Sequence, residues 1–146
     1  MTEIHRGGCH CGNIRVAYRT AKPVAEWPIR ACQCSFCRKH GVRATGDPDG
    51  LLEIAIADGA KVDRYRFGLG ITDFLICRAC GVYVSALVEE PDGLLATLIV
   101  NVLDLPQDAF PDPVPAHYDD ENEEQRLARR RLRWTPAAMV PPPAPA

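Results

Sequence analysis

The sequence lacks the features that place a chain in a membrane or on nucleic acid. Its longest apolar run, Leu94–Val100, is far shorter than the roughly 20 residues that a membrane-spanning helix needs. The opening residues, MTEIHRGGCHCG, contain no apolar stretch of the kind that a secretory signal requires. An excess of basic charge is also missing, because 17 Lys and Arg residues face 19 Asp and Glu residues. We therefore expect a cytoplasmic protein that binds neither membranes nor nucleic acid.

The sequence also lacks an even number of cysteines, since it has seven in 146 residues. A disulfide framework favours an even number in a small secreted domain, so reduced thiols that bind a metal are the better interpretation. The length is typical of one domain that buries a hydrophobic core of its own.

Alternating apolar segments separated by short turns predict a mainly β fold. In Gly12–Thr20, the side chains of Ile14, Val16 and Tyr18 alternate with arginines and alanine, as in a half-buried strand. The segment Gly46–Gly50 (GDPDG) combines the residues that favour tight turns. Further strands are expected at Ile29–Cys34, Leu51–Ala57, Lys61–Phe67, Thr72–Cys77, Val82–Val88 and Leu94–Val102. This spacing is typical of compact, mainly antiparallel sheets.

The composition changes after a first domain of residues 1–105. Residues 106–134 are expected to form a Pro-rich connector and one C-terminal helix packed on that domain. The helix is predicted over Asp119–Trp134, with an aspartate cap, acidic residues first and arginines last. Leu127 and Trp134 are expected to share its docking face, and its charged run to be a salt-bridged surface. The Pro-rich tail, residues 135–146, is predicted to be disordered. A brief helical turn, Phe36–His40, is expected with Ser35 as its cap.

The cysteines form three groups with the spacing of metal ligands, Cys9-x-Cys11, Cys32-x-Cys34-x-x-Cys37 and Cys77-x-x-Cys80. Residues i and i+2 of an extended segment project to one face, and a two-residue spacer lets the chain curl round an ion. Two pairs complete a closed Cys₄ site. Three ligands instead leave one coordination position open for water or substrate, as in a catalytic zinc site. The spacing does not decide which groups combine, and His40 is an alternative fourth ligand for the second site.

Three segments in this order, GGCHCGNIRVAY, ACQCSFCRKHG and ICRACGVYV, resemble the glutathione-dependent formaldehyde-activating enzyme family, which includes a centromere protein V-like branch. The resemblance extends over Gly7–Leu103. It implies a zinc-ribbon-related fold of twisted antiparallel sheets. It also implies a carbon–sulfur lyase that, in the synthetic direction, joins formaldehyde to glutathione to give S-hydroxymethylglutathione.

The resemblance further implies how the cysteines are divided between two zinc ions. A structural zinc would be held by Cys9, Cys11, Cys77 and Cys80. A second, more labile and catalytic zinc would be held by Cys32, Cys34 and Cys37. The substrates would then be a small thiol and an aldehyde, and we expect the thiol to bind as a thiolate because the metal lowers its pKa.

Several other polar residues are candidates for a substrate pocket, although ordinary surface or sheet positions explain them as well. The candidates are Arg38, Lys39, Arg43, Tyr65, Thr72 and Asn101. Three of them are basic residues that follow the second cysteine group, where they can meet the carboxylates of an acidic thiol. Trp27 and Trp134 are expected to pack in the interior.

Two other functions compete with the enzyme. The first is a non-catalytic zinc-binding interaction module, suggested by the small scaffold and by a Pro-rich tail of the kind that docks in aromatic grooves. The second is a thiol redox sensor that forms a disulfide between Cys32 and Cys34. Exposed strand edges also permit a homodimer.

Overall fold

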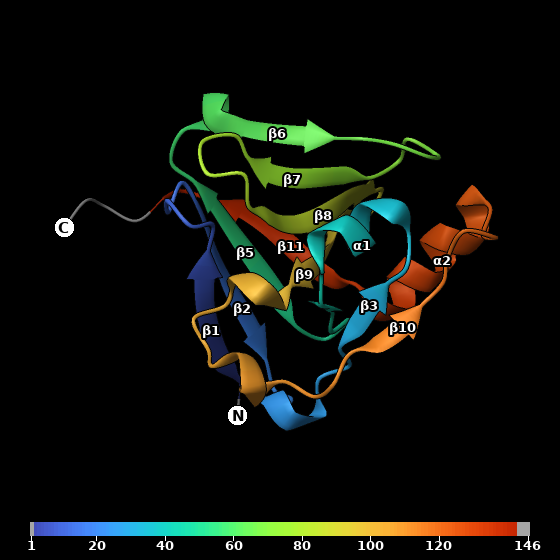
Figure 1. The fold of residues 1–146 in the computed structure, drawn as a ribbon, viewed down its shortest axis with the longest axis horizontal. Helices are drawn as coiled ribbons and strands as arrows, with labels where there is room; N and C mark the ends of the chain where they lie inside the picture. Colours follow the sequence, from blue (N-terminus) through green and yellow to red (C-terminus); the bar gives the residue numbers. More distant parts are fainter. Residues whose placement is uncertain (1, 143–146) are drawn as a thin grey trace.

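Eleven strands form one twisted, mixed sheet in the computed structural model, which describes residues 2–142 (Figure 1). The strands are β1 (Glu3–Gly8), β2 (Ile14–Thr20), β3 (Arg30–Cys32), β4 (Ala44–Thr45), β5 (Leu51–Ile56), β6 (Val62–Tyr65), β7 (Asp73–Cys77), β8 (Tyr83–Glu90), β9 (Gly93–Ile99), β10 (Val114–Ala116) and β11 (Thr135–Val140). The α-helices are α1 (Ser35–His40) and α2 (Glu123–Arg133). Short 3₁₀ turns cover Val24–Glu26, Gly59–Lys61, Val100–Val102 and Gln107–Ala109. The predicted mainly β fold is confirmed.

The strand order brings the middle and the end of the chain together. The main path through the sheet is β1-β2-β5-β11-β9-β4-β3-β10, and β8, β7 and β6 continue from β9. Most pairs are antiparallel, as expected, but β11 runs parallel to β5 and β10 runs parallel to β3. The sheet is therefore mixed although mainly antiparallel, because segments from beyond residue 105 insert beside earlier strands.

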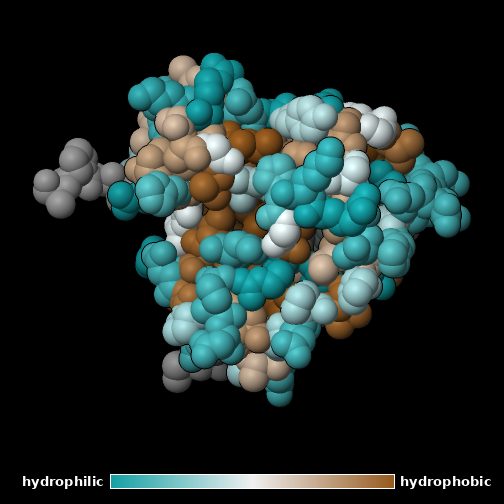
Figure 2. Space-filling model, viewed as in Figure 1, coloured by the Kyte–Doolittle hydropathy of each residue, from teal (hydrophilic) through white to brown (hydrophobic). Residues whose placement is uncertain are grey.

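The predicted alternation in β2 is confirmed by its burial. Ile14, Val16 and Tyr18 are buried in a core cluster with Leu52 and Leu98 from β5 and β9. A second cluster lies under α1 and α2 and contains the partly buried Leu127 of the predicted docking face. On the face seen in Figure 2, hydrophobic residues lie in a band between polar segments. Within residues 2–142, no helix has the length and apolar composition needed to cross a bilayer.

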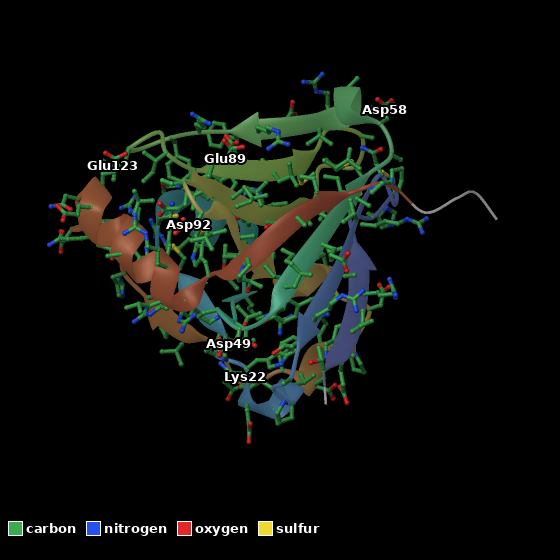
Figure 3. All side chains as sticks on the ribbon, turned by 180° about the vertical axis from the view of Figure 1, so that it is seen from behind. Lys22, Asp49, Asp58, Glu89, Asp92 and Glu123 are labelled. Atoms are coloured by element: carbon green, nitrogen blue, oxygen red, sulfur yellow. The ribbon has the colours of Figure 1, made fainter. Side chains whose placement is uncertain are left out.

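Both helices begin at positions that differ from the predicted ones. The N-cap of α1 is Cys34 rather than Ser35, and its sulfur accepts a hydrogen bond from the backbone N–H of Cys37. The N-cap of α2 is Asn122, whose side chain and that of Gln125 form a reciprocal capping box. The helix therefore starts later than Asp119. Figure 3 shows Glu123 at the outer end of α2, which lies along one side of the molecule.

The prediction of a disordered tail is wrong for Thr135–Val140, which form β11 between β5 and β9. Thr135 is fully buried, and its Oγ1 accepts a hydrogen bond from the backbone N–H of Asp47 at 2.8 Å. Asp47 belongs to the predicted GDPDG turn, which the Gly50 N–H closes by donating to the Asp47 carbonyl at 2.9 Å. Lys22 and Asp49 lie near this turn at one end of the molecule (Figure 3). In the rest of the predicted tail, Pro141 and Pro142 are exposed and belong to no strand, and residues 143–146 lie outside the described residues.

Candidate metal centres and the adjoining cavity

Four cysteines from two distant turns converge at one end of the sheet. Cys9 and Cys11 belong to the turn between β1 and β2, Cys77 ends β7, and Cys80 lies in the turn that leads to β8. Their four sulfur atoms all lie within 4.8 Å of one another. The Sγ atom of Cys11 lies 3.8 Å from that of Cys9 and 3.6 Å from that of Cys77. Four sulfurs at about 2.3 Å from one tetrahedral ion stand about 3.8 Å apart, so the cluster, named the quartet below, can hold a metal ion.

Each of the two turns folds back on itself through a glycine. Gly12 has φ +82° and Gly81 has φ +81°, a conformation that other residues rarely adopt. The Gly12 N–H donates to the Cys9 carbonyl at 3.2 Å, and the Gly81 N–H donates to the Cys77 carbonyl at 2.7 Å. Gly81 therefore makes the tight turn that follows the second pair of cysteines.

The thiols of the quartet differ in pKa because their surroundings differ. Burial raises the pKa of Cys9 to about 11, and the neighbouring thiols add to that effect. Burial also acts to raise the pKa of Cys80, but hydrogen bonds from the backbone at Cys11 and Val82 and from nearby thiols outweigh it and lower the value to about 6. Neighbouring thiols in the quartet thus resist deprotonation of all four at once. A cation bound among them would favour that deprotonation.

The remaining three cysteines form a second cluster, the trio, beside α1. Cys32 ends β3, Cys34 caps α1, and Cys37 lies in the first turn of the helix. Their sulfurs also lie within 4.8 Å of one another. The thiols of Cys32 and Cys37 stabilise the Cys34 thiolate and lower its pKa to about 2, whereas hydrogen bonds with Cys32 and Cys34 raise the pKa of Cys37. The trio therefore holds one thiolate readily and can bind a cation.

The trio differs from the quartet because it forms part of the wall of a cavity. All three of its cysteines line a cavity of about 540 Å³, together with Phe74 and Tyr83. A surface depression of about 680 Å³ borders Cys9 and Cys11, but neither Cys77 nor Cys80 lines it. The three sulfurs of the trio thus adjoin a space of the size that small molecules occupy in proteins.

The other walls of this cavity are rich in arginine, and apart from Arg38 sequence reasoning missed these residues. Six arginines line it, Arg30, Arg38, Arg126, Arg129, Arg130 and Arg133, with only two carboxylates, Asp119 and Glu121. The sequence indicated a salt-bridged surface helix, and Arg126 and Arg129 do pair with Glu121. Arg130 is buried instead, with its guanidinium over the Trp134 ring at 4.2 Å from the centroid. The helical spacing of Leu127, Arg130 and Trp134 is the signal that places Arg130 on the buried face.

Two of the other candidate pocket residues, Arg38 and Thr72, line the cavity. The backbone N–H of Arg43 donates to Asn101 Oδ1 at 3.0 Å, and the Arg43 side chain bonds Gln107, so these residues connect loops. Tyr65 stacks on Phe36 outside the cavity lining, and Lys39 is exposed. Trp27 and Trp134 are both buried, as expected.

His40 does not join the trio. Its Nδ1 lies 3.0 Å from the backbone carbonyl of Phe36, at the exposed end of α1. The alternative of a fourth protein ligand from His40 is therefore not seen in this arrangement.

No family model matches the chain. The chain is similar to a crystal structure of a Rhodobacter sphaeroides protein, with a TM-score of 0.54 and 25% sequence identity. The match covers 77% of this chain and 99% of the other. A solved protein thus shares the overall arrangement of strands found here.

Proposed function

We propose that this chain is a zinc-dependent carbon–sulfur lyase or synthase that joins a small thiol, such as glutathione, to an aldehyde such as formaldehyde. The observation that carries the proposal is the placement of the trio, whose three sulfurs lie within 4.8 Å of one another in the wall of a 540 Å³ cavity. The resemblance to the glutathione-dependent formaldehyde-activating family supports the same conclusion. The quartet would hold a structural zinc.

The trio fits zinc because thiolates are ligands that this ion prefers, and three of them leave one tetrahedral position free. A zinc ion held by Cys32, Cys34 and Cys37 would supply positive charge that lowers the pKa of an incoming thiol. The protein would hold the thiol and the aldehyde together in the cavity, which removes much of the entropic cost of their encounter.

The reaction balances without a further reactant. The thiol sulfur attacks the aldehyde carbon, a carbon–sulfur bond forms, and the electron pair of the carbonyl π bond moves to oxygen. That oxygen takes up the proton that the thiol released, so the product is a hydroxymethyl thioether. Tyr83 lies in the cavity wall, and burial raises its pKa well above the ordinary value. Its hydroxyl therefore keeps its proton and can donate a hydrogen bond to the developing alkoxide.

The proposal is tested by measuring the rate at which ¹³C-formaldehyde and a thiol interconvert with their adduct, by exchange NMR on zinc-loaded protein. We expect wild type to exceed the uncatalysed rate with at least one of glutathione, cysteine and 2-mercaptoethanol. Cys34→Ser should lower the enzymatic rate by more than the roughly 10–100-fold that changes around a metal's ligands cost. Lys39→Ala, an exposed neighbour on α1 that does not line the cavity, is the control and should retain the wild-type rate.

Two results would overturn the proposal. A wild-type rate equal to background with every thiol, in protein that carries two firmly held zinc ions, would favour a non-catalytic interaction module. A disulfide between Cys32 and Cys34 in protein isolated without reductant, detected by mass spectrometry, would favour a redox sensor.

A further inference from the structure

The strongest feature that the proposed chemistry does not use is a buried arginine without a carboxylate partner. Arg130 is 5% exposed, and its Nη1 donates a hydrogen bond to Thr72 Oγ1 at 2.7 Å. Within residues 2–142, no carboxylate forms an ion pair with Arg130, and its buried Nε has no acceptor. Buried charges in proteins are normally paired, so this guanidinium lacks the counter-charge that its position calls for.

The residues around Arg130 add to the excess of positive charge. Of the two carboxylates in the cavity wall, Glu121 is the one whose charge acts on Arg130. It accepts two hydrogen bonds from Arg129, at 2.8 and 2.9 Å, and also lies 3.6 Å from Arg126 Nε. Burial and, after it, the charges of Arg129 and Arg126 lower the pKa of Arg130 to about 10, and Glu121 offsets only part of that effect. Glu121 is therefore committed to other arginines.

The side chain of Arg130 is also held in place before any ligand arrives. Its guanidinium stacks on Trp134 and is fixed by Thr72, a buried residue that precedes β7. All three residues line the same cavity as the trio. A rigid guanidinium fork of this kind suits a planar carboxylate or a phosphate, which it binds through two parallel hydrogen bonds.

We propose that this cavity binds a small organic ligand through a compact anionic group, a carboxylate or a phosphate, and that Arg130 is the residue that holds it. The excess of arginines over carboxylates in the cavity walls favours an anion over a neutral or cationic ligand. The assignment of that anion to the thiol or aldehyde substrate rests on the proposed function, whereas anion binding itself does not.

Anion binding is tested with inorganic phosphate and succinate, titrated into zinc-loaded wild type at constant ionic strength with chloride as the background salt. Saturable shifts of the Arg130 Nε–H and Thr72 amide signals in ¹⁵N NMR spectra are the expected result. Arg130→Gln should weaken the affinity at least about tenfold, and Arg130→Lys should weaken it less because the charge remains. Arg131→Gln is the matched control, since Arg131 is exposed, pairs with Glu90 and does not line the cavity.

The same variants separate failure of the anion site from failure of the proposed reaction. With formaldehyde, 3-mercaptopropionate should react with a lower KM than the neutral 3-mercaptopropanol, and Arg130→Gln should remove that difference. Saturable anion binding without any catalysis would sustain the anion site and reject the reaction. The absence of saturable binding of both anions to wild type would overturn the anion site, whatever the catalytic result. Equal affinity of wild type and the folded Arg130→Lys and Arg130→Gln variants would overturn it as well.

Discussion

The Sγ atoms of Cys11 and Cys77 lie 3.6 Å apart although 66 positions separate these residues in the chain. The contact joins the turn after β1 to the last residue of β7, and these two strands belong to different branches of the sheet. An ion in the quartet would therefore link parts of the chain that no short hairpin connects, and it would constrain the unfolded chain as a long-range cross-link does.

Cys77→Ser is expected to remove one zinc ion per chain and to lower the free energy of unfolding by about 4 kcal/mol or more. The reason is that Cys77 is fully buried and contributes one of four ligands to the cross-link. Urea unfolding together with metal analysis measures both effects. Cys34→Ser is the control and should cost less stability, because the trio lies within one local segment. An unchanged free energy of unfolding for Cys77→Ser would contradict a structural role for the quartet.

The two clusters should release their metal at different rates. We expect two zinc ions per chain, one of which transfers to a chromophoric chelator quickly and exchanges in the presence of millimolar glutathione. The fast ion should belong to the trio, since three protein ligands hold an ion less firmly than four and the cavity gives access to it. Stopped-flow absorbance measures the release, and Cys34→Ser should eliminate the fast phase. A single slow phase for both ions in wild type is the opposing result.

Two C-terminal truncations should distinguish the contribution of β11 to stability from that of the residues after it. A chain that ends at Trp134 lacks the strand between β5 and β9 and is expected to lose its cooperative thermal transition. A chain that ends at Val140 should unfold within about 0.5 kcal/mol of the full-length protein. Calorimetry compares the two. Cooperative, wild-type-like unfolding of the shorter chain would show that β11 does not contribute to the fold.

The Glu121–Arg129 ion pair predicts a pH-dependent difference in stability. Hydrogen bonds from Arg129 lower the pKa of Glu121 below its usual value, so the pair stabilises the fold above the unfolded-state pKa of about 4.5. That contribution is lost as the pH falls through the lower, folded-state pKa. Glu121→Gln should therefore cost about 1 kcal/mol at pH 7 and progressively less under more acidic conditions. Urea unfolding at several pH values measures the difference, with the exposed Glu123→Gln as control; a pH-independent difference would contradict the ion pair.

Local patterns in the sequence were sufficient to predict a strand where the strand's own residues show which side chains are buried. The alternation of Ile14, Val16 and Tyr18 depends only on the two-residue period of a strand, so β2 was predictable. The segment that forms β11 has Pro136 and a Pro-rich continuation, which favour a loop when only local preferences are considered. Its pairing with β5 and β9 is a tertiary effect that no local period reveals.

The candidate site also has a part that was predictable from the sequence and a part that was not. Cysteine spacing marks the metal-ligand groups without any knowledge of the fold, and the structure brings the expected four and three sulfurs together. The cavity walls were not predictable, because Arg130 stands in a run of arginines that looks solvated. The helical spacing of Leu127, Arg130 and Trp134 indicates which member of this run faces inward, but the contacts of Arg130 with Trp134 and Thr72 are tertiary and appear only in the fold.

The division of seven sulfurs between two ions is tested most directly by anomalous diffraction at the zinc absorption edge, from crystals grown with zinc and reductant. The account predicts two zinc peaks. One should be surrounded by the sulfurs of Cys9, Cys11, Cys77 and Cys80, and the other by those of Cys32, Cys34 and Cys37, with its fourth ligand from outside the protein. A single peak at the quartet, with the three trio sulfurs free of metal or joined in a disulfide, would contradict it.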